Sequence, residues 1–324
     1  MPSRNMREDD ADFAVCCAVP VDAPGITIVS RPAGRPGEPE HGAPLFSRKY
    51  GQATGVVIFD KVFVPWDRVF LSGEWEFSGD ITYNYATHHR HSCIGARAGF
   101  GDLLIGAGIL MCEANGLDPN KKANLRDPMV ELIKITEGFY ACGVAASVYA
   151  VQDPYSKTFM PEPVYSNIGK LLLSTQIYDM HRLAHEVSGG LIVALPGPDE
   201  DHNPATAATL AEVLRANPDV PYDKRIEVSR FIEDLTASYQ GGWYSLISLH
   251  GGGSPTALRQ EIWRNYPVGS KVELVERLMD RGVLAEDNRA ITKNKQPGRC
   301  CDAGCSQPGQ PFMVPLPETK KKRA

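Results

Sequence analysis

The chain has 324 residues, which is enough for two compact units, and it is 43% hydrophobic and 23% charged, as in an ordinary globular protein. A net charge of −5 gives no basic field that would favour nucleic acid, and the basic residues 320–323 are expected to be a solvated terminus. No apolar stretch of membrane-spanning length is free of glycine or charge, and no signal region follows Met1, so the sequence predicts no membrane partner and a cytoplasmic location.

Residues 1–78 are predicted to form β-structure. Apolar or β-branched runs lie at 13–20, 25–30, 55–60 and 62–65. Pro65 lacks a donor for a sheet ladder, so the last of these strands is expected to end there or to lie at an edge. Strands and helices do not alternate, which excludes a Rossmann unit.

Residues 79–282 are predicted to form an antiparallel helix bundle. Long helices are expected at about 80–114, from Asp127-Pro128 to about 152, at 164–187 and at 222–249, with a possible break at Gly241-Gly242. A short helix is expected near 206–216, and a final helical pair is expected to reach about residue 281. Short connections between long helices favour a bundle.

The first long helix contains an unusual number of glycines. Each one costs about 1 kcal/mol relative to alanine, so the helix is predicted to press one face against another backbone or a flat ligand. The glycines are Gly95, Gly99, Gly101, Gly106 and Gly108.

Residues 283–324 contain five prolines and show no periodicity, so they are predicted to form an extended or disordered tail. The three cysteines of this tail, at 300, 301 and 305, match no zinc-binding spacing well.

A histidine-rich run opens the first long helix. His89 lies four residues before Cys93, on one helical face, and Arg97 follows on the same helix beyond Arg90. Such residues either serve a cofactor or substrate, or are partly buried groups that hydrogen bond locally. Two ligands do not make a metal site, so no metal is predicted here.

Two glycine-rich turns are candidates for ligand binding. The loop at 250–255, with the sequence HGGGSP, lets the backbone approach a ligand, and Ser254 and Pro255 can begin a helix whose free amides face it. The alternative is a plain turn between helices. Gly189 and Gly190 are a weaker candidate, because a glycine pair after a helix commonly acts as its C-cap.

At these motifs the sequence resembles a flavin-dependent family that joins 4-hydroxyphenylacetate 3-hydroxylase to 4-hydroxybutyryl-CoA dehydratase/vinylacetyl-CoA isomerase. It is most similar to the dehydratase branch. The resemblance covers about residues 6–282. The segments that carry it are 11–15 (ADFAV), 57–71 (VIFDKVFVPWDRVFL), 89–92 (HRHS), 101–107 (GDLLIGA), 140–143 (YACG), 189–191 (GGL) and 250–255 (HGGGSP).

The resemblance implies an α+β, acyl-CoA dehydrogenase-like fold, here a partial middle β-domain (1–78) followed by the C-terminal antiparallel helix bundle (79–282). It implies FAD between these parts, contact from a neighbouring subunit and a homotetramer. The family's helical N-terminal domain, which supplies two cluster cysteines in the dehydratase, has no counterpart here. A separate chain could supply it.

The dehydratase's working residues mostly do not carry over. The cluster histidine matches His89, which is kept. The other positions that the resemblance assigns to cluster or catalysis fall at Cys93 (tyrosine), Ala96 (cysteine), Arg97 (lysine), Thr54 (glutamate) and near Ile247 (glutamate). A cluster held by His89 alone is not credible, since iron–sulfur clusters need several thiolates.

The first functional expectation is therefore a flavin-dependent oxidoreductase, perhaps a monooxygenase, acting on a small phenolic or acyl-CoA substrate. His89, Arg90 and Arg97 are the expected catalytic residues. The expected FAD-binding residues are Gly189, Gly190, His250, Gly251, Gly252, Gly253 and Ser254. The alternatives are a divergent dehydratase/isomerase and a truncated, non-catalytic fragment or assembly partner.

Overall fold

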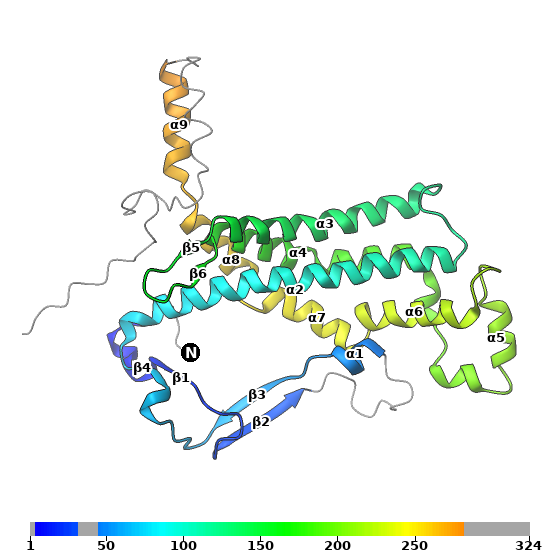
Figure 1. Cartoon of the computed structure of the whole chain (residues 1–324), viewed down its shortest axis with the longest axis horizontal. Helices are drawn as coiled ribbons and strands as arrows, with labels where there is room; N and C mark the ends of the chain where they lie inside the picture. Colours follow the sequence, from blue (N-terminus) through cyan, green and yellow to red (C-terminus); the bar gives the residue numbers. More distant parts are fainter. Residues whose placement is uncertain (1–3, 32–44, 282–324) are drawn as a thin grey trace, which may run out of the picture.

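The computed structural model describes residues 4–31 and 45–281, in which short strands precede a bundle of long helices (Figure 1). The predicted α+β class, with a β-region before an antiparallel helix bundle, is confirmed. The tail predicted for 283–324, with its three cysteines, lies outside the described residues.

The β-region contains two separate antiparallel pairs. β1 (Val15–Cys17) pairs with β4 (Val69–Ser72), and β2 (Ile26–Arg31) pairs with β3 (Thr54–Phe59) from Ile26 opposite Phe59 to Arg31 opposite Thr54. The strand predicted at 62–65 is wrong, because Pro65 instead precedes the 3-10 turn η2 (Trp66–Arg68) and the chain pairs again only from Val69. Two further 3-10 turns, η1 (Glu8–Phe13) and η3 (Trp75–Phe77), flank these strands.

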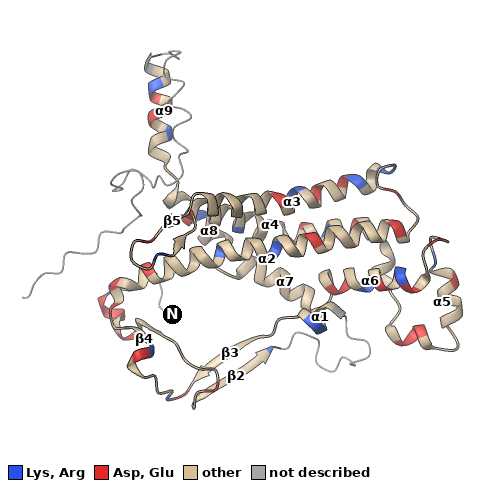
Figure 2. Cartoon of the chain, viewed as in Figure 1, with Lys and Arg blue, Asp and Glu red and all other residues tan. Residues whose placement is uncertain are grey.

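The ribbon of β2 and β3 exposes apolar side chains on both faces. Val29 and Val56 are 57% and 66% exposed, and Phe59 is 60% exposed. Figure 2 shows almost no charge along these two strands. The ribbon therefore lacks the covering layer that a sheet normally packs against.

α2 (Ser78–Ala114) is the central helix of the bundle and packs against α3 (Ala123–Val148), α4 (Pro163–Ser188) and α6 (Tyr222–Thr236). The core they share includes Ile94, Leu104, Phe139, Ile177 and Ile232. By length and composition alone, the segment Trp75–Ala114 is the one described stretch that could cross a membrane. Its position among three packed helices makes it a core helix here.

The α2 glycines divide into two groups. A Cβ atom at Gly101 would lie 2.4 Å from Thr136 Oγ1 of α3, and one at Gly108 would lie 2.9 Å from Met129 Sδ, so these two glycines permit close helix packing, as predicted. Gly95, Gly99 and Gly106 have nothing within 4 Å of the same position. Their face of the helix is open.

Two predicted helix boundaries are wrong. α3 begins at Ala123 rather than at Asp127-Pro128, and Pro128 lies inside the helix. The break in the last long helix falls at Ala237-Ser238 rather than at the glycine pair, because the Ser238 hydroxyl accepts from Gly241 N at 3.0 Å and caps α7 (Tyr239–His250).

The remaining elements are short. α1 (Leu45–Tyr50) packs on α6, while β5 (Val151–Gln152) and β6 (Phe159–Met160) form a small hairpin. After α4 come η4 (Gly190–Ala194), η5 (Pro198–His202) and α5 (Ala207–Val213). α8 (Pro255–Asn265) packs on α4, and α9 (Val268–Arg281) projects away from the bundle (Figure 1).

Candidate functional site

The first half of α2 presents His89, Cys93 and Arg97 one turn apart on one face. His89 Nδ1 lies 3.6 Å from Cys93 Sγ, as their four-residue spacing predicts. His91 faces α3 instead, where its Nε2 lies 3.1 Å from the Gly143 carbonyl oxygen. His89 belongs to the candidate site, whereas His91 joins two helices.

The glycine loop after α7 lies directly against these residues. The Gly252 carbonyl accepts from Arg90 Nε at 2.7 Å. A Cβ atom at Gly252 would lie 2.6 Å from His89 Nδ1, and one at Gly253 would lie 3.0 Å from Arg90 Nη2. Both glycines have positive φ, +78° and +111°. Residues more than 160 positions apart thus meet because this loop carries no side chains.

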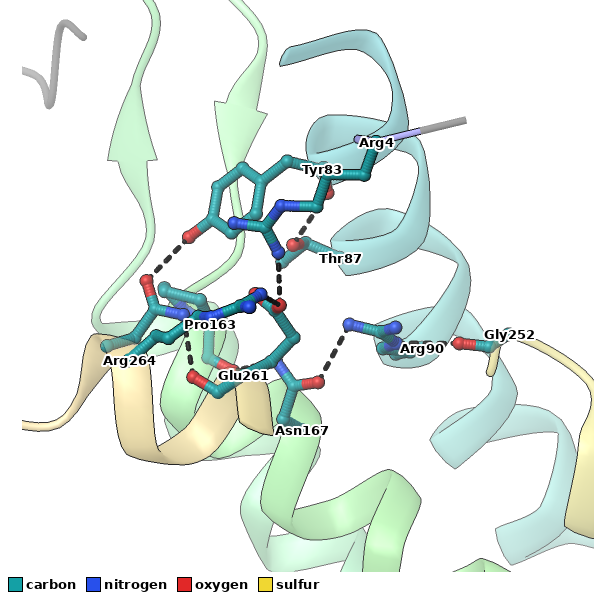
Figure 3. A network of polar contacts seen from close by, with 10 residues as sticks. Arg4, Tyr83, Thr87, Arg90, Pro163, Asn167, Gly252, Glu261 and Arg264 are labelled. Carbon is teal, nitrogen blue, oxygen red and sulfur yellow. Dashed lines mark hydrogen bonds and ion pairs between the residues drawn. The ribbon is translucent and has the colours of Figure 1, made fainter. Parts of the chain in front are cut away.

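Arg90 joins three elements (Figure 3). Besides Gly252, its Nη1 donates to Asn167 Oδ1 of α4 at 2.9 Å, and Asn167 Nδ2 donates to the Pro163 carbonyl at 2.6 Å. Arg90 is 7% exposed and Asn167 is fully buried. Two of the arginine's three nitrogens are therefore used to hold the bundle together.

A second polar network lies one turn away, around Glu261 of α8 (Figure 3). Glu261 pairs with Arg4 and, at 2.9 Å, with Arg264. Tyr83 of α2 donates to Asn265 Oδ1 at 2.9 Å. Burial raises the pKa of Glu261, but bonds to the two arginines outweigh it, so the pKa lies below its usual value. The carboxylate stays ionised and paired.

Lys170 of α4 lies beneath the histidine-bearing face and was not found from the sequence. It is fully buried and donates to the Ser248 carbonyl of α7 and to Ser174 Oγ, the latter at 3.0 Å. Ser248 also accepts, through its hydroxyl, from Arg97 Nε at 3.0 Å. Burial, with the charges of Arg97 and Arg90 nearby, lowers the pKa of Lys170 to about 8.

A sequence signal for Lys170 did exist. Asn167, Lys170 and Ser174 share one face of α4 at i, i+3 and i+7, between the buried residues Val164 and Leu173. Three polar residues on a core-facing stripe predict a buried polar site.

The protonation states follow from burial and neighbouring charge. Burial, together with Lys170 and Arg90, lowers the pKa of His89, so its imidazole is neutral at neutral pH. Burial raises the pKa of Cys93, which therefore remains a thiol. The site combines a neutral imidazole, which can accept a proton, with permanent cations.

Arg97 completes this cationic wall. Its guanidinium carbon lies 4.5 Å from the centre of the Tyr244 ring. The adjoining α2 positions Ala96, Gly95 and Gly99 are exposed. No group of three or more His, Cys, Asp or Glu side chains able to hold a metal occurs in residues 4–31 and 45–281.

The other predicted binding residues lie in different places. Ser254 caps α8, accepting from Ala257 N at 3.4 Å, and His250 is the exposed last residue of α7. Gly189 and Gly190 follow the C-terminus of α4, whereas Asn167 and Lys170 lie near its start. A 26-residue helix is about 39 Å long, so one chain does not bring this glycine pair to His89.

Two family models match the chain: 4-hydroxyphenylacetate 3-hydroxylase N terminal at residues 1–71 and 4-hydroxyphenylacetate 3-hydroxylase C terminal at residues 78–280. The chain is 31% identical over 287 residues to 4-hydroxybutyryl-CoA dehydratase/vinylacetyl-CoA-Δ-isomerase of Clostridium aminobutyricum, covering 85% of this chain and 58% of that protein. It is 23% identical to the oxygenase component of 4-hydroxyphenylacetate 3-monooxygenase of Thermus thermophilus, covering 82% and 54%.

Two solved structures share the fold. An oxygen-tolerant archaeal 4-hydroxybutyryl-CoA dehydratase from N. maritimus gives a TM-score of 0.77 at 29% identity, covering 90% of this chain and 59% of that one. An HpaB oxygenase component complexed with FAD gives 0.75 at 21% identity, covering 85% and 57%. The chain thus spans less than two thirds of the length of these relatives. With both family models matched in order, the chain belongs to the 4-hydroxyphenylacetate 3-hydroxylase family.

Proposed function

We propose that this chain forms the core of a flavin-dependent oxidoreductase that uses FAD or FADH2 on a small phenolic or acyl-CoA substrate. The observation that carries the proposal is the convergence of the Gly251–Gly253 loop and His89. A protein of this family has reason to bring a glycine turn, a helix start, a neutral imidazole and cations to one place, because a flavin and its substrate need all four.

The residues present fit such a cofactor. Next to His89 and Arg97, the α2 face at Ser92, Gly95 and Ala96 is exposed, and nothing lies within 4 Å of a Cβ atom at Gly95. A flat ring can lie against small side chains of this kind. The flavin would supply the electron transfer or oxygen chemistry. His89 would accept a proton from a substrate hydroxyl, and Arg97 would hold the resulting negative charge.

The dehydratase remains the second candidate, because the relative that is 31% identical carries that name. The donor set disfavours it. The position assigned to a cluster cysteine is Ala96, and Cys93 lies next to His89 rather than in that place. Thr54, where a glutamate was expected, accepts from Trp243 Nε1 at 3.2 Å. Iron-containing protein after oxygen-free purification would favour the dehydratase; iron-free protein that binds flavin would favour the first candidate.

We also propose that the active form is a homo-oligomer, in keeping with the expected tetramer. Gly189 and Gly190 are exposed at the far end of α4, with nothing within 4 Å of their Cβ positions. If this turn binds flavin as well, the flavin must belong to the site of another subunit. The apolar ribbon of β2 and β3 would be covered by further family structure, whether from the same polypeptide or from a separate chain.

The test is a titration of the purified protein with FAD, and with FADH2 without oxygen, followed by flavin fluorescence and size-exclusion chromatography. Saturable binding by a discrete oligomer is expected. Absence of binding, with aggregation of the chain, would support the third alternative, a non-catalytic fragment, and would contradict this proposal. Gly252→Val should weaken binding, because the new side chain would displace His89.

A further inference from the structure

Arg97 and Lys170 are two cations that meet at one residue. Arg97 donates to the Ser248 hydroxyl at 3.0 Å, and Lys170 donates to the Ser248 carbonyl. Neither forms an ion pair with a carboxylate in the described part of the chain. Elsewhere this protein pairs its partly buried arginines: Arg230 lies 2.6 Å from Asp201, and Arg4 pairs with Glu261.

The neighbouring groups balance only part of this charge. Ser248 lies in the last turn of α7, where helix carbonyls carry a partial negative charge, and this stabilises the Lys170 ammonium. Arg97 has only a neutral hydroxyl and the face of Tyr244. Burying an unbalanced charge costs several kcal/mol, so the arrangement is costly unless an anion joins it.

The two side chains can still accept a ligand. An ammonium has three N–H donors, and Lys170 uses two of them, on Ser248 and Ser174. A guanidinium has five, of which Arg97 Nε uses one on Ser248. Arg97 is half-buried, and its neighbours Ala96 and Gly99 on α2 are exposed, so the approach is from the open glycine face.

We propose that Arg97 and Lys170 together bind a singly charged, delocalised oxyanion on the open face of α2. One charge matches the pair, because the end of α7 already offsets part of Lys170. A planar anion suits the planar guanidinium of Arg97. Arg90 does not belong to this site, since it is bonded to Gly252 and Asn167. Two sources share this chemistry: a phenolate or enolate of the substrate, and the oxygen-bearing edge of a reduced flavin. The flavin source rests on the proposed function.

The first experiment uses 4-nitrophenol, whose anion is read by its visible absorbance, with the flavin-free protein. Wild type should bind the phenolate, Arg97→Gln should bind about tenfold more weakly, and Arg97→Lys should retain most of the affinity. Arg182→Gln is the matched control, because Arg182 pairs with Asp179 and Glu186 on the surface of α4. Lys170→Met tests the second cation; if it does not fold, as judged by circular dichroism, Lys170→Arg replaces it.

The second experiment measures the midpoint potential of FAD bound to the same variants. If the reduced flavin is the anion, Arg97→Gln should lower the potential by about 30 mV, which equals a tenfold loss of preference for the reduced form in a two-electron couple. A change in phenolate binding alone assigns the site to the substrate, and a change in potential alone assigns it to the flavin.

The inference is overturned if neither phenolate affinity nor potential changes in Arg97→Gln and in the Lys170 variant. It fails separately from the proposed function. If FAD does not bind, the proposed function fails, and the phenolate titration alone decides whether the oxyanion site exists.

Discussion

The two polar centres along the first half of α2 differ in how their charges are balanced. Around Glu261, one buried carboxylate pairs with Arg4 and Arg264, and the network ties the N-terminal segment to α8. Around Ser248, two cations from α2 and α4 meet without a carboxylate. The first arrangement is what a protein uses for structure. The second is incomplete by itself, which is typical of a ligand site.

If this difference is real, changes at the two centres should affect different properties. Substitutions around Glu261 should lower stability, whereas substitutions around Ser248 should alter binding and pH dependence. Four predictions test this, beginning with the largest expected effect.

The pH dependence of stability should reveal Lys170. Its pKa is about 8 in the folded protein against an ordinary lysine value of 10.5, so between these values the unfolded chain binds more protons. Unfolding free energy should therefore rise as pH increases from 8 towards 10, by up to about 3 kcal/mol. Urea denaturation of wild type and Lys170→Met measures it, since the difference between the two removes other titrating groups. Equal slopes in the two proteins would contradict a charged, buried lysine.

Glu261→Ala should lower the unfolding free energy by about 2 kcal/mol, because it leaves Arg4 and Arg264 without their carboxylate. The figure is below that of a fully buried pair, since both arginine side chains are partly exposed. Chemical denaturation at neutral pH measures the loss. Glu186→Ala on the surface of α4 is the control and should change stability by less than about 0.5 kcal/mol. A similar loss in both variants would show that the Glu261 network is not structural.

Gly252→Ala and Gly189→Ala form a matched pair. Both glycines have φ of +78°, so alanine is strained by about 1 kcal/mol at either site. Only at Gly252 would the new Cβ atom meet His89, at 2.6 Å from Nδ1. The Gly252 variant should therefore lose about 1 kcal/mol more in thermal or urea unfolding. Equal losses would mean that the loop does not lie against His89.

Arg97→Gln should have the smallest effect on stability, within about 0.5 kcal/mol, because it removes an unbalanced charge together with one bond to Ser248. Urea denaturation checks it. A loss as large as that of Glu261→Ala would place Arg97 with the structural arginines and remove the contrast between the centres.

Local sequence signals predicted most of the elements but not the contacts that depend on packing. Gly189 ended α4 and Ser254 began α8, because each acts within its own turn. The predicted strand at 62–65 was wrong because partners for pairing, rather than β-propensity, determine a strand. The break before α7 was missed because Ser238 was not considered as a cap.

The candidate site shows the same limit. Four-residue spacing predicted the contact of His89 with Cys93, and the glycine loop was expected to face the histidine-bearing helix. Lys170 was missed because its role depends on Ser248, 78 positions later, and no local pattern predicts that α4 and α7 bring them together. Which residues bind a cofactor stays a prediction.

The most direct test follows the histidine signals of the isotope-labelled protein by NMR while FAD is added. The account predicts that the His89 resonances, assigned with His89→Gln, shift in a saturable way, whereas those of His202, near η5, do not. Saturable FAD binding that leaves His89 unchanged would place the flavin elsewhere and contradict the account.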